Sequence, residues 1–508
     1  MSRSPSLRTD SSAPPFHRLL VANRGEIAIR VIRACRELGI SPIAVHSDVD
    51  AHALHVRAAD LSEPIGTATA RDSYLSIDAI LEAARRSGAE AIHPGYGFLS
   101  ENAAFAAAVE GAGLVFVGPP PPALEALGNK LEARRSASAA GVPIVPGTTV
   151  ALEEDIGAVT EIGYPVMLKA AAGGGGRGMR RVDEAGQLTE AMAAARREAA
   201  AAFGDGTIYV ERMIAPARHV EVQLLGDRHG NLALLGERDC SVQRRHQKLV
   251  EEAPSPAVDD RMREALFDSA RRVAATVDFH NAATVEFLLD TEGHHFFLEM
   301  NTRLQVEHGV TELVTGIDLV GWQIRVAAGD RLPPEVLGAP RRGHAIEVRL
   351  YAEDPYDGFR PVAGRVGAWR MPEGPGTRVD AGIEADTDLR PEYDPLLTKL
   401  MVHAADRPAA VDRLRRALDE TLIGGVQTDA GFLRWLVDDE AFVAGAYDTS
   451  LVAERWMNGP ALSAEERSLA GLVALEARRN AGASPVAPAT AATGSAWGER
   501  ARREALRG

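Results

Sequence analysis

Buried strands and amphipathic helices alternate at the start of the chain. Residues 18–23 (RLLVAN) form an apolar run of strand length, residues 25–39 carry a helical stripe of apolar side chains, and residues 42–47 return to a strand pattern. The same order recurs between residues 89 and 118. Parallel strands need such crossovers, so the sequence predicts a doubly wound parallel sheet with helices on its faces.

The turn after the first strand excludes one common use of such a sheet. It consists of Asn23, Arg24, Gly25 and Glu26 and lacks the G-x-G-x-x-G pattern that binds dinucleotides. A dehydrogenase is therefore not expected.

Further changes of pattern divide the rest of the chain. Four consecutive prolines at 119–122 predict a stiff boundary, and a compact α/β unit is expected over 142–212 around a run of glycines. Antiparallel hairpins are predicted beyond it, the first over 219–240. Two helical patterns follow, over 409–421 and 428–444, and the end of the chain is rich in Ala, Pro and Ser, which is typical of a tail.

The composition narrows the class of protein. No apolar run approaches the ~20 residues of a spanning helix, and the first 15 residues lack the apolar core of a signal peptide. The net charge of −15 argues against nucleic acid as a partner, and Cys35 and Cys240 are too few for a disulfide framework. We expect a cytoplasmic protein that does not bind membranes and has a disordered start; an organelle transit peptide is the alternative for that start.

A glycine-rich loop is the strongest local signal. A predicted strand that carries Lys169 leads directly into Gly173, Gly174, Gly175, Gly176 and Gly178. Exposed backbone N–H groups of such a loop can fold over phosphates, with the lysine as the nearby cation. The lysine precedes the glycines, so this is not a Walker A motif. A flexible linker is the alternative reading of the glycines alone.

A predicted hairpin over 284–303 brings carboxylates together. Strand alternation places Glu299 and Asn301 on one face, and a turn centred on Glu292 and Gly293 would set Glu286 opposite Glu299, with Cβ atoms ~5 Å apart. Facing carboxylates repel unless a cation lies between them, and hard oxygen ligands suit Mg²⁺ or Mn²⁺. The alternative is a different register with one glutamate in solvent.

The same face continues beyond the hairpin with Arg303, Gln305 and Glu307, which could hold a small oxyanion and remove its proton. His246 and Lys248 are two residues apart, so both could point into the same cleft. Taken alone, their segment is more typical of a solvated basic patch.

Together these motifs resemble the biotin carboxylases, ATP-grasp enzymes that carry out the first half-reaction of acetyl-CoA, propionyl-CoA and pyruvate carboxylases. The resemblance runs from about residue 19 to residue 456. Its blocks include VANRGEIAIRVIRACRELGI, IHPGYGFLSENA, KAAAGGGGRGMR, ERDCSVQRRHQKLVEEAP, LEMNTRLQVEH, GHAIEVRLYAEDP and YDPLLTKL.

The resemblance implies a fold and a domain order. The fold would be α/β, an ATP-grasp with an N-terminal doubly wound domain, a small α/β lid and a mixed or antiparallel C-terminal domain. The implied segments are a disordered extension (1–15), the N-terminal domain (16–129), a linker with the lid (130–212), the ATP-grasp and C-terminal part (213–460) and a tail (461–508).

The resemblance also implies residue roles. Lys130, Lys169 and the glycine loop would contact the ATP phosphates; Glu211 and the backbone near Ile214 would hold the ribose and adenine; and His219, Gln243 and His246 would line the nucleotide cleft. Glu286, Glu299 and Asn301 would bind the metal; Lys248, Arg303, Gln305 and Val306 would form the bicarbonate pocket. Glu307 would be the general base, Arg349 would stabilise the biotin enolate, and Tyr96 would lie beside the biotin ureido ring.

The lysine count bears on partners. The chain has only Lys130, Lys169, Lys248 and Lys399, and none lies in the Met-Lys-Met context in which this family attaches biotin. We therefore expect biotin on a separate carrier protein or domain. The resemblance further implies a homodimer, a partner carboxyltransferase, and ATP, Mg²⁺ or Mn²⁺ and bicarbonate as ligands. No chemical role follows for Lys399, and the final acyl acceptor stays open.

Some positions depart from the family pattern. Arg212 replaces a usual lysine, Asn129 replaces a common aspartate, and Gly309 replaces a proline, which would loosen the turn behind Glu307. Cys240 is expected to be a buried, unreactive thiol. Another ATP-grasp ligase that forms a different acyl phosphate is one alternative function, and a regulatory nucleotide-binding protein without turnover is the other.

Overall fold

The computed structural model describes residues 15–150, 156–170, 179–203, 206–456 and 459. The expected disordered extension, the glycines of the predicted phosphate loop and the expected tail lie outside these residues, apart from Pro15. In the part of the chain that is described, no helix has the length and apolarity needed to cross a membrane.

The N-terminal sheet is parallel, as the alternation predicts. Its strand order is β3-β2-β1-β4-β5, and every neighbouring pair is parallel. Helix α1 packs through its buried apolar side chains, among them Ile27 and Val31. The bounds are β1 (Arg18–Val21), α1 (Gly25–Glu37), β2 (Ser41–Ser47), α2 (Leu54–Ala58), β3 (Leu61–Gly66), α3 (Ile77–Ser87), β4 (Ala91–His93), α4 (Ala103–Gly111) and β5 (Val115–Phe116).

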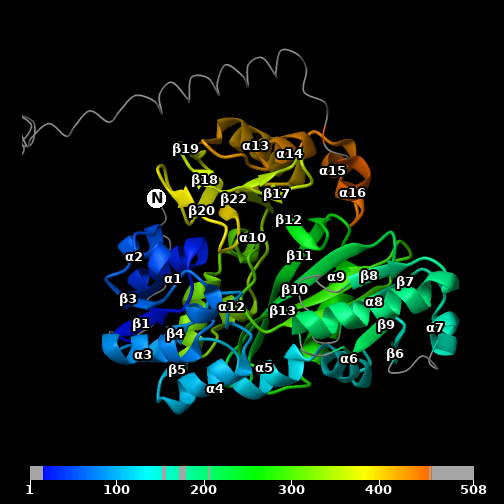
Figure 1. The fold of residues 1–508 in the computed structure, drawn as a ribbon, viewed down its shortest axis with the longest axis horizontal. Helices are drawn as coiled ribbons and strands as arrows, with labels where there is room; N and C mark the ends of the chain where they lie inside the picture. Colours follow the sequence, from blue (N-terminus) through cyan, green and yellow to red (C-terminus); the bar gives the residue numbers. More distant parts are fainter. Residues whose placement is uncertain (1–14, 151–155, 171–178, 204–205, 457–458, 460–508) are drawn as a thin grey trace, which may run out of the picture. The chain divides into compact units, whose positions relative to one another are not determined.

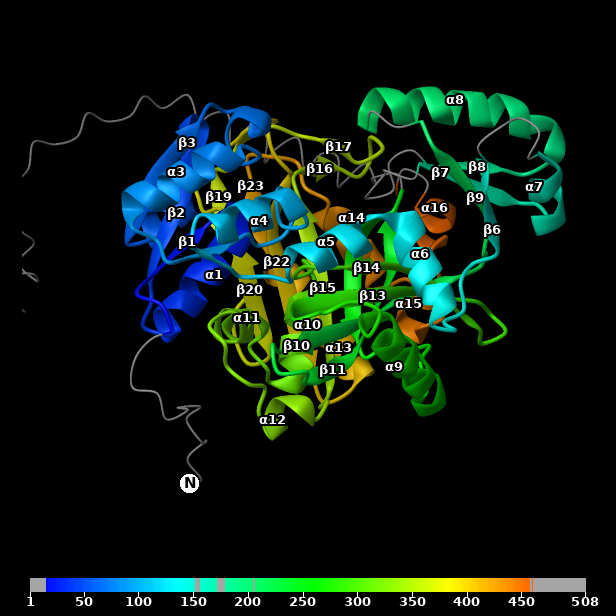
Figure 2. The same ribbon diagram turned by 90° about the horizontal axis from the view of Figure 1, so that it is seen from below.

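A smaller four-stranded antiparallel sheet, β6-β9-β7-β8, carries Lys169 on β7. Helix α8 covers this sheet through apolar side chains such as Leu188 and Ala195 (Figure 2). The bounds are β6 (Gly147–Val150), α7 (Ile156–Ile162), β7 (Val166–Ala170), β8 (Met179–Val182), α8 (Ala185–Phe203) and β9 (Ile208–Arg212).

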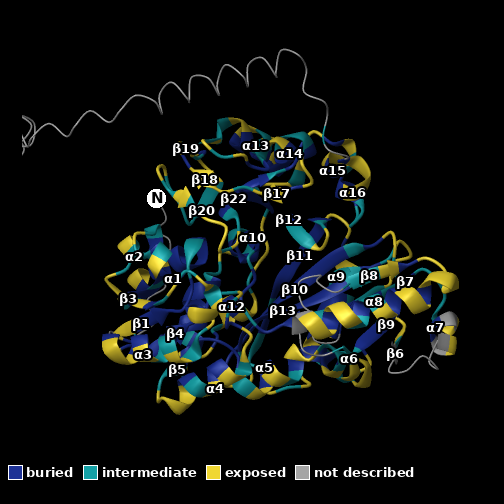
Figure 3. Cartoon of the chain, in the orientation of Figure 1, coloured by how far each residue is buried: buried dark blue, intermediate teal, exposed yellow. Residues whose placement is uncertain are grey.

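The largest sheet has eight strands in the order β14-β13-β10-β11-β12-β15-β22-β20, all antiparallel. Its strands β10, β11, β12 and β13 are labelled in Figure 1. Both predicted hairpins belong to this sheet and are confirmed. Burial is concentrated in these strands (Figure 3). The bounds are β10 (Arg218–Gly226), β11 (Leu232–Arg244), β12 (Gln247–Ala253), β13 (Asn281–Leu289), β14 (His295–Asn301), β15 (His344–Tyr351), β20 (Thr377–Ala381) and β22 (Leu396–Ala404).

The remaining helices connect and cover the sheets, and short strands complete the C-terminal part. The helices are α5 (Pro121–Gly128), α6 (Lys130–Ala139), α9 (Asp260–Ala274), α10 (His308–Thr315), α11 (Leu319–Ala327), α12 (Pro334–Leu337), α13 (Arg407–Glu420), α14 (Ala430–Leu436), α15 (Glu440–Ala444) and α16 (Leu451–Arg455). The short strands are β16 (Glu353–Asp354), β17 (Arg360–Pro361), β18 (Gly364–Arg365), β19 (Ala368–Arg370), β21 (Asp388–Leu389) and β23 (Leu422–Gly424).

Two local predictions need correction. The proline run was predicted as a stiff boundary, but Pro121 is the first residue of helix α5. At this position the missing N–H costs no hydrogen bond. The helical pattern over 428–444 is two helices, α14 and α15. Asp439 separates them, since its carboxylate accepts from the N–H groups of Ala441 and Phe442 and thereby caps a new helix.

Candidate active site

Every predicted site residue that the structure describes lines one cleft. The cleft has a volume of 2380 Å³ and lies between the N-terminal sheet, the small sheet and the large sheet. The five glycines of the predicted phosphate loop, Gly173, Gly174, Gly175, Gly176 and Gly178, lie outside the described residues. The predicted residues on the cleft wall are Tyr96, Lys130, Lys169, Glu211, Ile214, His219, Gln243, His246, Lys248, Glu286, Glu299, Asn301, Arg303, Gln305, Val306, Glu307 and Arg349.

The predicted pairing of Glu286 with Glu299 is confirmed. Near the turn the ladder runs one residue differently, with Phe287 opposite Phe297, and an irregularity at Leu298 restores the predicted partner. Val285 and Phe287 point into the core, so Glu286 faces the cleft by strand alternation.

Glu286 is held by several donors. Its carboxylate lies 2.7 Å from His219 Nε2 and accepts hydrogen bonds from Lys248 Nζ at 3.0 Å and Asn301 Nδ2 at 2.9 Å. Burial raises its pKa, but Lys248 and His219 outweigh burial and hold the pKa below its usual range. Glu299 is more exposed and pairs with Lys130 at 2.9 Å. The oxygen donors of Glu286, Glu299 and Asn301 therefore fit Mg²⁺ or Mn²⁺.

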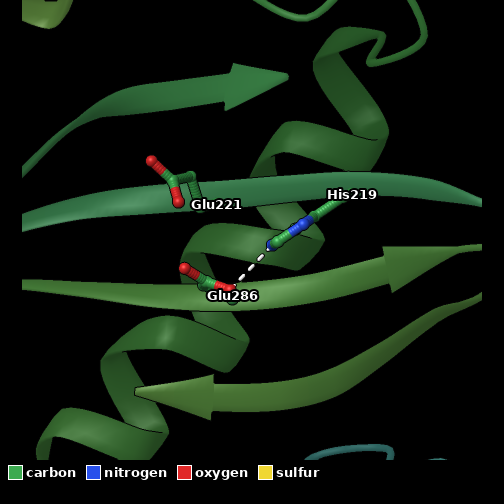
Figure 4. Close-up of side chains that lie close together, drawn as sticks. All are labelled: His219, Glu221 and Glu286. Atoms are coloured by element: carbon green, nitrogen blue, oxygen red, sulfur yellow. Dashed lines mark hydrogen bonds and ion pairs between the residues drawn. The ribbon is translucent and has the colours of Figure 1, made fainter. Parts of the chain in front are cut away.

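Figure 4 shows His219, Glu221 and Glu286 meeting across strands β10 and β13. Three such ligands could by geometry hold a metal. Lys248 Nζ, however, donates to Glu221 at 2.7 Å as well as to Glu286. The Lys248 ammonium thus already neutralises the negative charge of Glu221 and Glu286. We therefore describe this cluster as the ion-pair partners of Lys248 and not as a metal site.

Glu307 completes the surroundings of Lys248. Its carboxylate is fully buried and accepts from Lys248 at 2.6 Å and from Arg349 at 2.9 Å. Burial raises the pKa of Glu307, yet Lys248, Arg349 and Arg238 outweigh burial and hold it well below its usual range. Arg238 is itself buried and donates to Glu221 at 2.5 Å. Sequence patterns identify neither Glu221 nor Arg238.

Further acidic groups surround Arg349. Its guanidinium pairs with Glu251 as well as Glu307, and Glu347 is buried nearby. Burial raises the pKa of Glu251 to about 7, with Arg349 opposing the rise. The guanidinium is therefore held by one carboxylate on β12 and one in the segment before α10, which limits its movement.

The opposite end of the cleft is basic. Glu211 pairs with both Lys169 and Arg134, and Arg134 also donates to the Val145 carbonyl. Lys130 begins helix α6, whose first N–H groups are capped by the Asn129 side chain at 3.1 Å. Asparagine therefore caps this helix in place of the usual aspartate. Arg134 has no sequence signal, because its partners lie in other segments.

Arg303 is anchored by a residue that the sequence does not single out. Its guanidinium lies 3.0 Å from Glu101 Oε2 and donates to Gln305 Oε1 at 2.9 Å. Arg303 and Gln305 are thus in contact, as their spacing predicts, on the side of the cleft that also holds Glu307.

One departure from the family pattern is explained by packing. A Cβ atom at Gly309 would lie 2.2 Å from Met401 Sδ, and Met401 is fully buried. The space beside the glycine is thus filled, which offsets the loosening expected from the sequence. Cys240 is buried as expected, and burial raises the pKa of its thiol well above the usual range.

Three family models match the chain in order. "Biotin carboxylase, N-terminal domain" matches residues 15–124, "Carbamoyl-phosphate synthase L chain, ATP binding domain" matches 129–335, and "Biotin carboxylase C-terminal domain" matches 347–454.

A curated relative and solved structures agree with these models. A biotin carboxylase of Nostoc sp. is 49% identical over 86% of this chain and 99% of its own. The biotin carboxylase domain dimer of Hydrogenobacter thermophilus 2-oxoglutarate carboxylase, solved with MgADP, ADP and bicarbonate, has a TM-score of 0.85 and 43% identity over 88% of this chain and 99% of its own. Rhizobium etli pyruvate carboxylase has a TM-score of 0.85 and 42% identity over 91% of this chain and 42% of its own. The chain belongs to the biotin carboxylase family.

Proposed function

We propose that this chain uses ATP and bicarbonate to carboxylate biotin. The observation that carries the proposal is the arrangement of Lys248, Glu307 and Arg349, which form one hydrogen-bonded group in a cleft that also holds two lysines suited to phosphates. Another ATP-grasp ligase would share the phosphate-binding lysines and the metal carboxylates, but it would not need Arg349 beside Glu307.

In the proposed reaction, a bicarbonate oxygen attacks the γ-phosphorus of ATP, and carboxyphosphate and ADP form. Lys130 and Lys169 would neutralise the phosphates, and Lys248, Arg303 and Gln305 would hold bicarbonate. A divalent ion at Glu286, Glu299 and Asn301 would supply charge neutralisation between the phosphates.

Glu307 would accept the proton that bicarbonate loses. Carboxyphosphate then releases CO₂ and phosphate. N1′ of biotin transfers its proton to the released phosphate and forms a bond to CO₂. Arg349 would stabilise the negative charge that develops on the biotin oxygen, because its guanidinium is already fixed in place.

Biotin would arrive on a separate carrier protein or domain, because none of the four lysines lies between methionines. A carboxyltransferase would use the product. The two similar structures named above come from different carboxylases, so the final acceptor depends on that partner. We also propose a homodimer, on the likeness to a domain that was solved as a dimer.

Bicarbonate-dependent release of ADP tests the proposed function. ADP formation should require Mg²⁺ and rise when free biotin is added. Release at the same rate without biotin would contradict the carboxylase assignment and favour another ATP-grasp ligase. Purification of the native complex would identify the carrier and the carboxyltransferase.

A further inference from the structure

Lys399 is fully buried on β22, the strand next to the edge strand β20 of the large sheet. It lies on β22, opposite Arg349 of β15 on one side and opposite Asp380 of β20 on the other. A lysine side chain is seldom buried unless its charge is paired. The buried ammonium of Lys399, beside Arg349, therefore needs hydrogen-bond or ion-pair partners.

The Lys399 ammonium joins two segments that are distant in the sequence. Nζ donates to the Val306 carbonyl at 2.7 Å and lies 3.3 Å from Glu26 Oε1 in the first turn of α1. Glu26 in turn accepts a hydrogen bond from the Tyr96 hydroxyl. Burial lowers the pKa of Lys399, but Glu26, Glu347 and Asp380 outweigh burial and keep the group charged.

The Val306 carbonyl belongs to the peptide unit that continues into Glu307. This unit lies in the short segment between the end of β14 and the start of α10. A charge-assisted hydrogen bond to that carbonyl restricts the rotation of the peptide unit. The direction of the Glu307 side chain depends on this backbone, since Glu307 immediately precedes the helix.

We propose that Lys399 is a positioning residue that fixes the Val306–Glu307 peptide unit and thereby holds Glu307 between Lys248 and Arg349. This inference rests on the proposed function. Lys399 also connects Glu307 to Glu26 and Tyr96. Tyr96 is expected to contact biotin and Glu307 to take the proton of bicarbonate, so one buried ammonium links both parts of the site.

The role favours a compact cation with several donors. One ammonium carries three N–H groups and can serve a carbonyl and a carboxylate together. A guanidinium is larger and planar, and this side chain has no exposed surface toward which it could expand. The chain retains only four lysines among 56 basic residues, and Lys399 is one of them.

Lys399→Met tests the proposal, because methionine keeps most of the volume and removes the charge. Biotin-dependent turnover should fall about 10- to 100-fold, the range expected when a reacting group is displaced by about an ångström. The affinity for MgADP should change by less than about a factor of three, because the nucleotide end of the cleft is untouched. Thr398→Val is the matched control: it alters the neighbouring buried position of the same strand, whose hydroxyl donates to the Asp380 carbonyl and not to Val306.

A second variant covers the case in which Lys399→Met does not fold. Glu26→Gln combined with Lys399→Met removes both charges and leaves an acceptor for Tyr96. Reduced turnover with intact MgADP binding in either variant supports the positioning role. Wild-type turnover, or an equal loss of turnover and MgADP affinity, overturns it. The wild-type protein in the same assay tests the proposed function separately: absence of its turnover overturns both, whereas turnover in wild type and variant alike overturns only the role of Lys399.

Discussion

Arg349 donates a hydrogen bond of 2.9 Å to Glu307, so the arginine expected to stabilise biotin is ion-paired with the expected general base. The two residues come from different elements, β15 and the segment before α10. Burial raises the pKa of Glu307, and Lys248 and Arg349 lower it further than burial raises it. A carboxylate with a depressed pKa is a weak base. The two cations also keep Glu307 ionised, which is the form in which a carboxylate can accept a proton.

Arg349→Ala separates the two roles of the arginine. We expect kcat/KM for biotin carboxylation to fall about 10²- to 10³-fold, as for the loss of one preorganised donor. Removal of a cation also raises the pKa of Glu307, so the acid limb of the pH profile should move to higher pH. Nucleotide affinity, measured by calorimetry with MgADP, should stay close to wild type.

The control for this change is Arg365→Ala, which removes an exposed arginine paired with Asp386. It should leave both turnover and the pH profile unchanged. Equal losses of MgADP affinity and carboxylation in Arg349→Ala would contradict its assignment to the biotin side of the site.

Glu299→Gln should weaken metal binding with little effect on stability. Glu299 is partly exposed and has Lys130 as its ion-pair partner, whereas Glu286 also binds Lys248 and His219. We expect the Mg²⁺ concentration for half-maximal activity to rise at least about tenfold. Binding of Mn²⁺ with ADP, followed by electron paramagnetic resonance, should weaken in parallel.

Two further variants sharpen this test. Glu286→Gln should weaken metal binding and also lower the melting temperature, because a buried cation loses its partner. Glu292→Gln, in the exposed turn of the same hairpin, should change neither quantity. Normal Mn²⁺ binding by the Glu299→Gln variant would show that Glu299 is not a metal ligand.

Strand alternation and turn position predicted that Glu286 faces Glu299. The ladder next to the turn is offset by one residue from that prediction, and the irregularity at Leu298 restores the predicted pair. Alternation and turn position could not predict this irregularity, since residues 296–298 are all apolar and so do not mark where the alternation shifts. The division of the pattern over 428–444 was missed for a similar reason. Asp439 favours a cap, but the apolar period continues across it.

The network around Glu307 lay beyond sequence patterns. Lys399 and Glu26 are far apart in the chain, and only the packing of α1 against β22 brings their side chains to 3.3 Å. Arg238 and Glu221 face each other across two strands in the interior, where charged residues are rare. The one available signal was the scarcity of lysine, which singles out Lys399 without indicating its partner.

Gly309 and Met401 should be energetically coupled. Gly309→Ala places a Cβ against the buried Met401 sulfur, so we expect a loss of about 1–3 kcal/mol in unfolding free energy. In a Met401→Ala background the same change should be neutral or stabilising. The space for the Cβ is then open, and alanine stabilises a helix by about 0.5–1 kcal/mol relative to glycine. Urea unfolding of the four proteins measures the coupling.

Gly111→Ala is the control for the glycine effect, since a Cβ at that helical position meets nothing within 4 Å. It should be neutral or stabilising. Additive effects of Gly309→Ala and Met401→Ala would show that the two side chains do not compete for one space.

Glu252 makes folding stability depend on pH. This buried carboxylate binds His344 at 2.5 Å and Arg407 at 2.7 and 3.0 Å. Burial raises its pKa, but these two partners outweigh burial and lower it to about 2. The unfolded value is about 4.3, so the carboxylate contributes about 3 kcal/mol at neutral pH. Because the folded pKa is depressed, this stability is present above about pH 5 and is lost as the pH falls toward 2.

Glu252→Gln removes the titrating group and tests this directly. The variant should be less stable than wild type at pH 7 by about 3 kcal/mol or more, since Arg407 also loses its charged partner. The difference should narrow steadily as the pH is lowered from about 5 to 3, because wild type alone loses the contribution of an ionised Glu252. Urea unfolding over this range measures it, with the exposed Glu125→Gln as the control that should follow wild type. A difference between wild type and Glu252→Gln that stays constant with pH would mean that Glu252 titrates at the same pH in the folded and the unfolded chain.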